Sequence, residues 1–280
     1  MTNTDIFNIW NFHKELEGTN FSLKGHSRGG ERTCFQIPAI SLMFDAGLRT
    51  HQTPNHIFIT HTHCDHFFDL PIILAGEDTH TDIYTPVSIE LVNDFIVSSF
   101  KMMYQGGNKL PSFKVHQVNY NDIINFTENK RDYQVDVFKC FHRVKTVGYG
   151  ISEIKNKLKH EYNNKSGPEI VALKKAGINI SEKVKDPQVV YLTDTNIKVF
   201  NNNNIFNYKN IIVECTILDE ENKESAYKNG HIYWGDLSSI IESHPNNKFI
   251  LIHFSTRYTD EYITEFFDKI PLTNVFPWLN

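Results

Sequence analysis

The segment His56-Ile57-Phe58-Ile59-Thr60-His61-Thr62-His63-Cys64-Asp65-His66 decides the fold, because an apolar strand leads directly into four side chains that bind metals. Side chains alternate between the two faces of a strand, so His61 and His63 are expected to leave the strand end on one side. The turn that follows lets Asp65 and His66 approach from the other. Imidazole and carboxylate groups suit divalent zinc, and two such pairs predict two adjacent metals. Chance clustering on a solvated loop is the alternative, since the chain has 14 histidines.

Three further candidate ligands stand at the ends of apolar runs. His142, Asp194 and His253 each follow directly on a segment that is expected to be a buried strand. Loops at strand ends carry chemistry on a rigid scaffold, so this repeated pattern predicts a dinuclear site at one edge of a sheet layer. Taken singly, each is more often a satisfied core or surface residue. Combined with the 61–66 motif, they predict a metal centre.

Length and composition predict a single enzyme domain inside the cell. A chain of 280 residues with 40% hydrophobic side chains can bury a sizeable core, built from two similar halves. The formal net charge of −5 excludes a global basic field, so nucleic-acid binding requires a local patch. No run approaches the roughly 18 apolar residues of a membrane span, and Met1–Asp5 carry neither a basic nor an apolar segment. A soluble protein of the cytoplasm or nucleus is expected.

The four cysteines are widely spaced and form no CxxC pair. Cys34, Cys140 and Cys215 lie inside apolar runs, which predicts buried free thiols in a reducing compartment rather than disulfides. Cys64 occupies a spacer position in the 61–66 motif, where a passive role is favoured over a ligand or redox role.

The expected elements indicate a sandwich of two sheets with helices outside. In the first half, period-two alternation predicts strands at residues 8–12, 33–37, 40–44 and 57–60, and helical spacing predicts a helix over 86–104 that begins with proline. The second half is expected to repeat the scheme, with strands at 133–141, 189–193, 210–217 and 248–254 and helices near 233–244 and 259–270. The asparagine-rich residues 201–204 are interpreted as a short polar loop.

Residues 22 to 260 resemble the tRNase Z branch of the metallo-β-lactamase superfamily. The 61–66 motif with its later partners resembles the superfamily, and the segment His253-Phe254-Ser255-Thr256-Arg257-Tyr258 is the most specific match to the branch. The chain is most similar to the short eukaryotic form, whose insertion begins as Lys157-Leu158-Lys159-His160-Glu161-Tyr162 does here. The resemblance implies an α/β chain with the metallo-β-lactamase fold, a four-layer αββα sandwich. It also implies one domain over residues 1–280, with a short lysine-rich, exosite-like insertion around 153–180.

The resemblance assigns the candidate ligands to two zinc ions per chain. One zinc is implied at His61, His63 and His142, the other at Asp65, His66 and His253, with Asp194 bridging them. A hydroxide that bridges the metals would be the nucleophile, since paired metals stabilise both the attacking and the departing oxygen of a phosphoryl displacement. Asp65 is also a candidate base that orients the water, which ranks second to its role as a ligand.

Two further residues match the proton-transfer pair of the family. His231 matches its non-ligand helper histidine, and Glu214 matches the acid that orients it, so His231 is implied as a general acid. The alternative is a buried hydrogen-bonded pair without a catalytic role. Asp45 is expected to accept a hydrogen bond from a ligand histidine. Ile232 and Tyr233 depart from the family pattern after the helper histidine, which affects the fit of the substrate more than the binding of metal.

A local basic excess is the feature that fits RNA. Six lysines lie between Lys155 and Lys175 against two glutamates, and the corresponding insertion of the family grips the tRNA elbow. Lys155, Lys157 and Lys159 are therefore candidate RNA contacts, together with Arg257. An ordinary solvated lysine-rich loop is the alternative.

The resemblance implies a zinc-dependent endoribonuclease that removes the 3′ trailer of precursor tRNA, leaves a 5′-phosphomonoester on the trailer, and forms a homodimer. A second interpretation is a hydrolase of small thioester, lactam or phosphodiester substrates, because the same nucleophile can attack an acyl carbon. A third is a non-catalytic RNA-binding or dimer-partner subunit. The lysine cluster favours the first interpretation over the second, and His231 with Glu214 favours it over the third.

Overall fold

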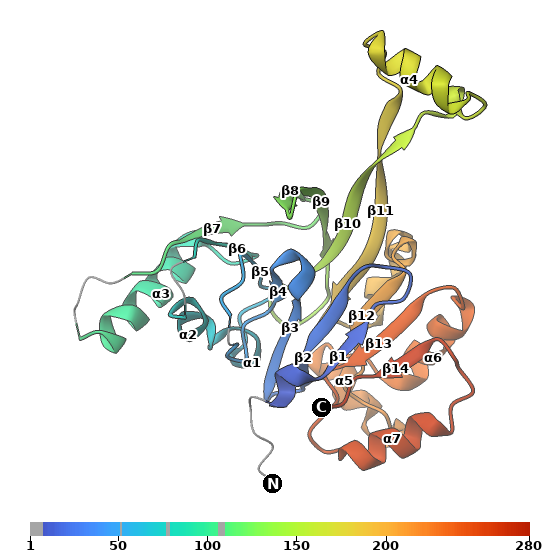
Figure 1. Cartoon of the computed structure of the whole chain (residues 1–280). Helices are drawn as coiled ribbons and strands as arrows, with labels where there is room; N and C mark the ends of the chain where they lie inside the picture. Colours follow the sequence, from blue (N-terminus) through green and yellow to red (C-terminus); the bar gives the residue numbers. More distant parts are fainter. Residues whose placement is uncertain (1–7, 51, 77–78, 106–109) are drawn as a thin grey trace.

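Two stacked sheets form the centre of the molecule in the computed structural model, which describes residues 8–50, 52–76, 79–105 and 110–280 (Figure 1). The Met1–Asp5 segment lies outside these residues. Among the described residues the first seven-stranded sheet runs in chain order through β1 (His13–Glu15), β2 (Ser22–Arg28), β3 (Arg32–Ile37), β4 (Leu42–Phe44), β5 (His56–Phe58), β6 (Thr81–Thr85) and β7 (Phe113–Gln117). The second has the strands β8 (Ile123–Glu128), β9 (Arg131–Lys139), β10 (Val147–Leu158), β11 (Ser181–Leu192), β12 (Asn210–Glu214), β13 (Lys248–Ile252) and β14 (Val275–Pro277).

Both sheets follow the same plan. In the first, β1 to β4 pair antiparallel and β4 to β7 pair parallel. In the second, β8 to β11 pair antiparallel and β11 to β14 pair parallel. The expectation of two similar halves, made from the order of elements, therefore agrees with the topology. Because the parallel strands of each half end at the same edge, the loops after β5, β11 and β13 can meet.

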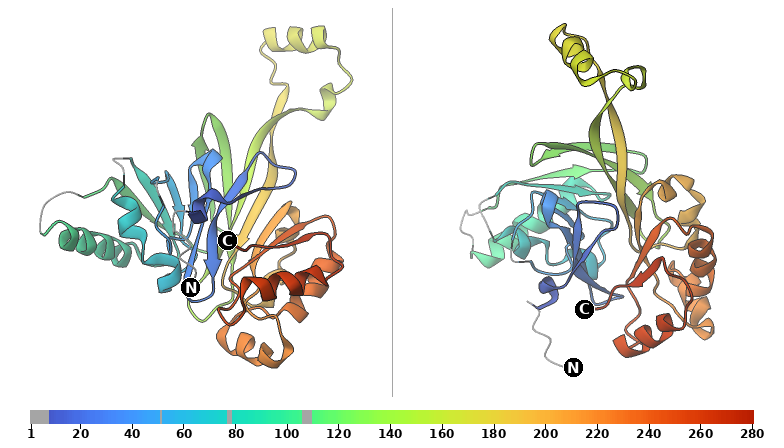
Figure 2. Two further views of the ribbon diagram at one scale, coloured as in Figure 1. Left: turned by 60° about the horizontal axis from the view of Figure 1, so that its bottom comes forward. Right: turned by 45° about the vertical axis from the view of Figure 1, so that its right-hand side comes forward.

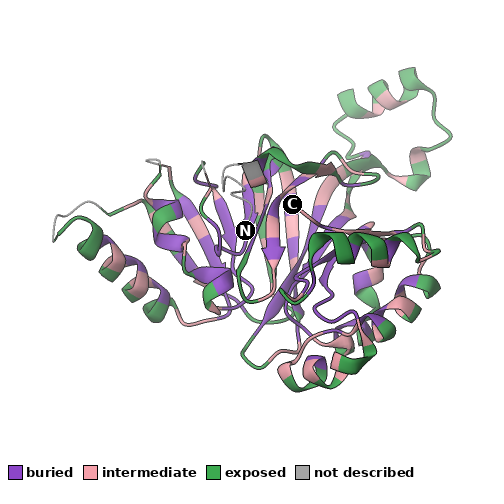
Figure 3. Ribbon diagram, turned by 90° about the horizontal axis from the view of Figure 1, so that it is seen from below, coloured by how far each residue is buried: buried purple, intermediate pink, exposed green. Residues whose placement is uncertain are grey.

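Side-chain alternation explains why the sheets are covered on both faces. Ile250 and Ile252 of β13 belong to the core between the sheets, whereas Phe249 and Leu251 belong to the cluster beneath the outer helices. The second outer layer packs the helices of the first half against their own sheet. Two sheets enclosed by two helical layers make the four-layer αββα sandwich that the sequence predicted, with buried strands and exposed outer helix faces (Figure 3).

Apart from α4, the helices lie on the outer faces of the sheets (Figure 2). Those of the first half are α1 (Cys64–Phe67), α2 (Leu70–Leu74) and α3 (Ile89–Met103); those of the second are α4 (Gly167–Lys175), α5 (Lys223–Asn229), α6 (Trp234–Ser243) and α7 (Asp260–Asp268). Helix α3 begins after Ser88, whose side chain accepts from Leu91 N, rather than at Pro86 as expected. No helix in the described residues is both long and apolar enough to cross a membrane.

One expected strand is wrong. Residues 8–11 form a 3₁₀ helix, because the indole of Trp10 turns inward and donates from Nε1 to the carbonyl of Arg49 at 2.9 Å. The strand expected at 57–60 already ends at Phe58, although Ile59 N still donates to the carbonyl of Tyr84 at 2.8 Å and the carbonyl of Thr60 accepts from Val147 N at 3.1 Å.

Strands β10 and β11 extend beyond the sheet as a long two-stranded arm (Figure 1). Their inner halves are buried in the sandwich, whereas residues 155–158 and 182–183 are mostly exposed. The arm begins beyond Ile154, the last residue of β10 that pairs with β9, and a register shift in the pairing of β10 with β11 lies shortly before it, between Ile151 and Ser152. The tip carries a 3₁₀ turn at His160–Tyr162 and helix α4, which has no buried residue.

Candidate active site

The predicted ligands meet at one edge of the two sheets. His142 follows β9, Asp194 follows β11 and His253 follows β13, each within three residues of the strand end. The 61–66 motif does not turn back as a loop. The short helix α1 instead begins directly after His63, and this helical turn carries Asp65 and His66 inward.

A close backbone approach holds the helical turn in place. A Cβ atom at Gly47 would lie 1.7 Å from the carbonyl oxygen of Asp65, so only glycine fits there. The neighbouring Ala46 N donates to the carbonyl of His66 at 2.6 Å. The Phe44–Gly47 segment thus fixes the helix that presents two of the candidate ligands.

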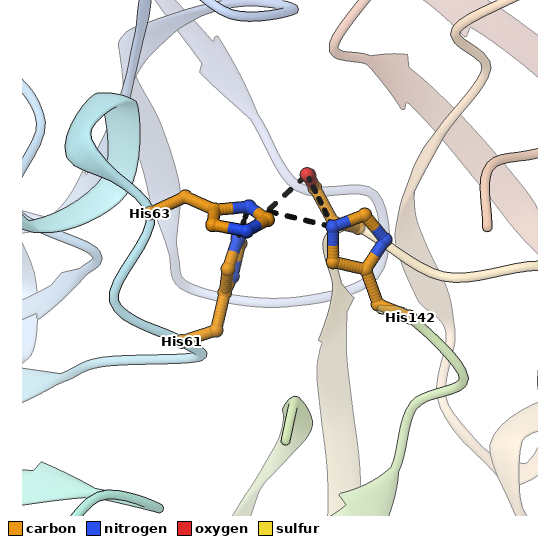
Figure 4. A group of neighbouring side chains, drawn as sticks. His61, His63 and His142 are labelled. Carbon is orange, nitrogen blue, oxygen red and sulfur yellow. Dashed lines mark hydrogen bonds and ion pairs between the residues drawn. The ribbon is translucent and has the colours of Figure 1, made fainter. Parts of the chain in front are cut away.

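Four side chains form the first group of candidate ligands. His61 Nε2 lies 3.0 Å from His63 Nδ1, and His142 Nε2 lies 3.4 Å from the same nitrogen. Asp194 Oδ2 lies 3.7 Å from both His61 Nε2 and His142 Nε2. The candidate ligand atoms all lie within 4.8 Å of one another. The three histidines gather around one space in Figure 4.

The second group contains Asp65, His66 and His253, whose candidate ligand atoms also lie within 4.8 Å of one another. Asp65 Oδ2 lies 3.4 Å from His66 Nε2 and 3.6 Å from His253 Nε2. Asp194 Oδ1 lies 3.3 Å from His66 Nε2 and 3.2 Å from His253 Nε2. The two oxygens of one buried carboxylate therefore face different groups, as a bridging ligand requires.

Asp45 is connected by hydrogen bonds to both groups of candidate ligands. Its Oδ2 accepts from His66 Nδ1 at 2.9 Å and from the Tyr191 hydroxyl at 3.0 Å. Its Oδ1 accepts from the Thr60 hydroxyl at 2.8 Å, and Thr60 Oγ1 lies 3.1 Å from His61 Nδ1. One carboxylate thus orients a histidine in each group, and turns the Nε2 atoms toward the cluster.

Glu214 organises the opposite side of the cluster. Its fully buried carboxylate accepts from His231 Nδ1 at 2.8 Å and from the hydroxyl of Thr216. Thr216 Oγ1 lies 3.1 Å from His253 Nδ1. Glu214 is therefore linked to a candidate ligand as well as to the candidate general acid. Burial alone would lower the pKa of His231, but the charge and hydrogen bond of Glu214 raise it to about 9.

The donor set suits a metal ion. Burial lowers the pKa of the three histidines of the first group, which keeps their ring nitrogens neutral and able to coordinate. Burial alone would raise the pKa of Asp194, but His253 and His66 hold it well below its ordinary value. Neutral imidazoles and ionised carboxylates at these distances are the ligands that zinc takes in proteins.

The remaining candidate residues are distributed over two regions. Arg257 is exposed and lines a hollow of about 280 Å³ with His231, so the structure brings it to the cluster. Lys155, Lys157 and Lys159 lie on the arm, apart from the cluster. Lys155 Nζ is already paired with Asp186 Oδ2 at 2.6 Å, whereas Lys157 is exposed and Lys159 is half-buried.

Several residues of the site have no signal in the sequence. Thr60 and Tyr191 lie on apolar runs and read as ordinary core residues, yet both hydrogen-bond Asp45. Gly230 accepts from His142 Nδ1 at 3.1 Å through its backbone, which no side-chain pattern can reveal. Asp45 and His253 have φ angles of 57° and 61°, a region that favours glycine.

The cysteines take the positions expected of them. Cys34, Cys140 and Cys215 are buried, Cys64 is exposed, and all four thiols are free. Burial raises the pKa of Cys140 and Cys215, so both remain protonated near neutral pH.

Comparison with solved structures identifies the fold. The human tRNase Z short form superposes with a TM-score of 0.56 at 18% identity, over 84% of this chain and 93% of the human chain. The metallo-β-lactamase fold protein YhfI of Bacillus subtilis superposes with a TM-score of 0.58 at 14% identity, over 91% of this chain and 95% of that chain. The sandwich with this cluster at its edge thus has the metallo-β-lactamase fold.

Sequence comparison is more specific. The chain is 30% identical over 269 residues to tRNase Z TRZ1 of Arabidopsis thaliana, a match that covers 92% of this chain and 94% of the relative. It belongs to the tRNase Z family of endoribonucleases. No protein-family model matches the chain.

Proposed function

We propose that the chain removes the 3′ trailer of precursor tRNA with two zinc ions at the cluster. The division of the Asp194 oxygens between two groups of ligands carries this proposal, because a bridged pair of metals is the apparatus of an in-line phosphoryl displacement. Membership of the tRNase Z family supports precursor tRNA as the substrate.

Seven side chains would hold the two ions. They are His61, His63 and His142 at one position, Asp65, His66 and His253 at the other, and Asp194 between them. Bound zinc ions would lower the pKa of a water molecule and neutralise charge on the scissile phosphate. Asp45 and Thr216 would keep the ligand rings in a single tautomer and orientation.

The protein side chains would control the protons. Asp65 accepts from Gly30 N at 3.1 Å, which fixes its carboxylate where it can orient the attacking water. Attack at phosphorus breaks the bond to the ribose O3′, and His231 would donate its proton to that oxygen. The tRNA then keeps a 3′-hydroxyl and the trailer leaves with a 5′-phosphate. Glu214 keeps His231 protonated and correctly turned for this step.

The arm would bind the body of the tRNA. Residues 153–180 form an insertion into one domain and carry the exposed Lys157, Lys174 and Lys175 and the half-buried Lys159, away from the cluster. Lysines that neutralise phosphates contribute affinity without reading sequence. A contact far from the cut would let the enzyme recognise the folded tRNA rather than the trailer.

The decisive experiment compares a precursor tRNA with two acyl substrates. Purified protein is incubated with a precursor tRNA labelled at its 5′ end and, separately, with a chromogenic β-lactam and a thioester. We expect cleavage of the tRNA at its 3′ end, sensitivity to chelator, and restoration by zinc. Turnover of the acyl substrates alone would assign the cluster to small-molecule hydrolysis, and inactivity on all of them would favour a non-catalytic subunit.

We also propose a homodimer that works in the cytoplasm or nucleus. Exposed apolar side chains on and beside α3 support a protein interface, with Leu91 64% and Met102 75% exposed. Free thiols at all four cysteines fit a reducing compartment.

The homodimer can be tested by sedimentation equilibrium, which would show twice the chain mass of 32.6 kDa. A single species at the chain mass would contradict the dimer.

A further inference from the structure

A second hollow, of about 600 Å³, lies beside His142. It opens between the end of β9, the loop over residues 141–146 and helix α5. Lys139, Arg143, Lys145 and Lys228 line it, and no carboxylate is found among the described residues of its wall. Four cationic groups around one hollow are exceptional in a chain whose formal net charge is −5. The hollow therefore attracts an anion.

Aromatic rings are placed among these cations. Lys139 Nζ lies over the rings of Tyr120 and Phe141, at 5.5 and 5.0 Å from their centroids. Tyr227, on α5, is 47% exposed and donates its hydroxyl to Asp236 Oδ2 at 2.9 Å, which fixes the ring at the rim. Exposed rings held between cations offer flat faces to a planar anionic ligand.

The wall is rigid where it meets the cluster. Two hydrogen bonds hold the backbone of Phe141. Its N–H donates to Thr195 Oγ1 at 2.9 Å, and its carbonyl accepts from Asn196 N at 3.0 Å. Lys145 Nζ donates to Asn119 Oδ1 at 2.8 Å. A ligand here would be held in a constant position relative to the adjacent His142.

Arg143 connects the two hollows. It lines the larger hollow with Lys139 and also the smaller one with His231 and Arg257. His231 would protonate the ribose oxygen that stays on the tRNA, so the smaller hollow belongs to the tRNA side of the cut. The larger hollow lies on the other side of Arg143, where the strand that carries the new 5′-phosphate would continue.

We propose that the larger hollow binds the first unpaired nucleotides of the 3′ trailer, with bases on Tyr120 and Tyr227 and phosphates at Lys139, Arg143 and Lys145. The proposal rests on the proposed function and adds a subsite to it. Aromatic faces accept unpaired bases of any sequence, because every base has a π face and a paired base does not offer it. Cations along the same path neutralise the backbone.

The first test uses precursor tRNAs with a six-nucleotide trailer. One carries natural bases, and the other has abasic sites at the first three trailer positions, which keep the phosphates but remove the rings. Tyr120→Ala and Tyr227→Ala should each raise KM about tenfold on the natural trailer and leave the abasic substrate unchanged. Lys145→Ala should weaken both substrates, since the phosphates remain. Lys269→Ala, at an exposed residue elsewhere, serves as the control.

The second test judges the hollow apart from catalysis. Binding of a fluorescent 5′-phosphorylated hexanucleotide is followed by anisotropy, with metal content measured for each variant to confirm an intact cluster. Loss of hexanucleotide binding in Tyr120→Ala and Lys145→Ala supports the subsite, whether or not precursor tRNA is cleaved. Absence of cleavage by the wild type would overturn only the proposed function. Cleavage of precursor tRNA by wild type, with hexanucleotide binding and KM unchanged in every variant, would overturn the subsite. Equal losses on the natural and abasic trailers in the tyrosine variants would also overturn it.

Discussion

His66 Nδ1 donates a hydrogen bond to Asp45 Oδ2 at 2.9 Å, and neither side chain is exposed to solvent. Because Asp45 also reaches His61 through Thr60, this carboxylate couples the two groups of ligands. Asp45→Asn should therefore weaken metal binding about 10- to 100-fold, the usual effect of losing such a support. Competition with a chelator measures the affinity. Asp82→Asn, which disturbs a comparable bond to His116 at 2.7 Å, is the matched control and should bind metal normally.

Metal content tests the bridging role of Asp194. Wild-type protein purified gently should contain close to two transition-metal ions per chain. Asp194→Ala should lower the occupancy of both positions, since one oxygen faces each group. Elemental analysis gives the count. Loss of a single ion would place Asp194 on one metal only, and wild-type protein that lacks metal and ignores chelator would refute the centre altogether.

The role of His231 can be separated from metal binding. His231→Ala should slow cleavage of precursor tRNA by roughly 10² to 10⁴ fold, the range for a positioned acid, while metal content stays unchanged. Single-turnover kinetics and elemental analysis are compared on the same preparation. A variant that loses metal would make His231 a ligand, and one that loses stability but keeps its rate would make the pair with Glu214 structural.

Glu214 should determine where activity falls at alkaline pH. The pKa of His231 is raised to about 9, so its acidic form persists below that pH and the rate falls as pH rises through it. Glu214→Gln removes the negative charge that raises this pKa, and the alkaline limb should move to lower pH. Profiles of kcat/KM measured from pH 6 to 10 give the pH at which activity falls on the alkaline side. An unchanged limb would show that another group controls it.

The arm should contribute affinity that depends on salt. Lys155 is tied to Asp186, so its loss would also disturb the arm, and Lys157→Ala with Lys159→Ala is the cleaner test. The double variant should bind precursor tRNA more weakly, with a salt slope shallower by about 0.9 per lost contact. Hydrolysis of a small nitrophenyl phosphodiester should be unchanged. Equal losses on both substrates would make the arm structural, and no loss on either would move the RNA contacts elsewhere.

The ligands could be predicted because each one stands where an apolar run stops. A strand that is buried on both faces has a continuous apolar sequence, so the polar residue that ends it is conspicuous. The supporting network could not be predicted in the same way. Thr60 and Tyr191 are hydroxyl residues in buried strands, and only the packing of the two sheets brings both to Asp45.

The strands and the 3₁₀ helix that the sequence did not predict all lack a clear apolar periodicity. Strands β7 and β8 lie at the ends of their sheets and give a weak apolar signal, because β7 has a single buried residue and β8 alternates between exposed and half-buried residues. The outer part of β10 is lysine-rich because it pairs only with β11 in solvent, so its sequence resembles a loop. The 3₁₀ helix at residues 8–11 has the same apolar spacing as a short strand. Four residues are too few to distinguish these periods.

The backbone conformations of His253 and Asp45 carry an energetic cost. Left-handed conformations cost a residue other than glycine on the order of 1–3 kcal/mol, and both His253 and Asp45 adopt one. Glycine at either position would relieve that cost and would make a purely structural protein more stable. A histidine and an aspartate that remain at such positions are explained by what their side chains do. The cost at these two positions is thus connected to the candidate metal centre, because His253 Nε2 faces Asp194 and Asp45 orients His66.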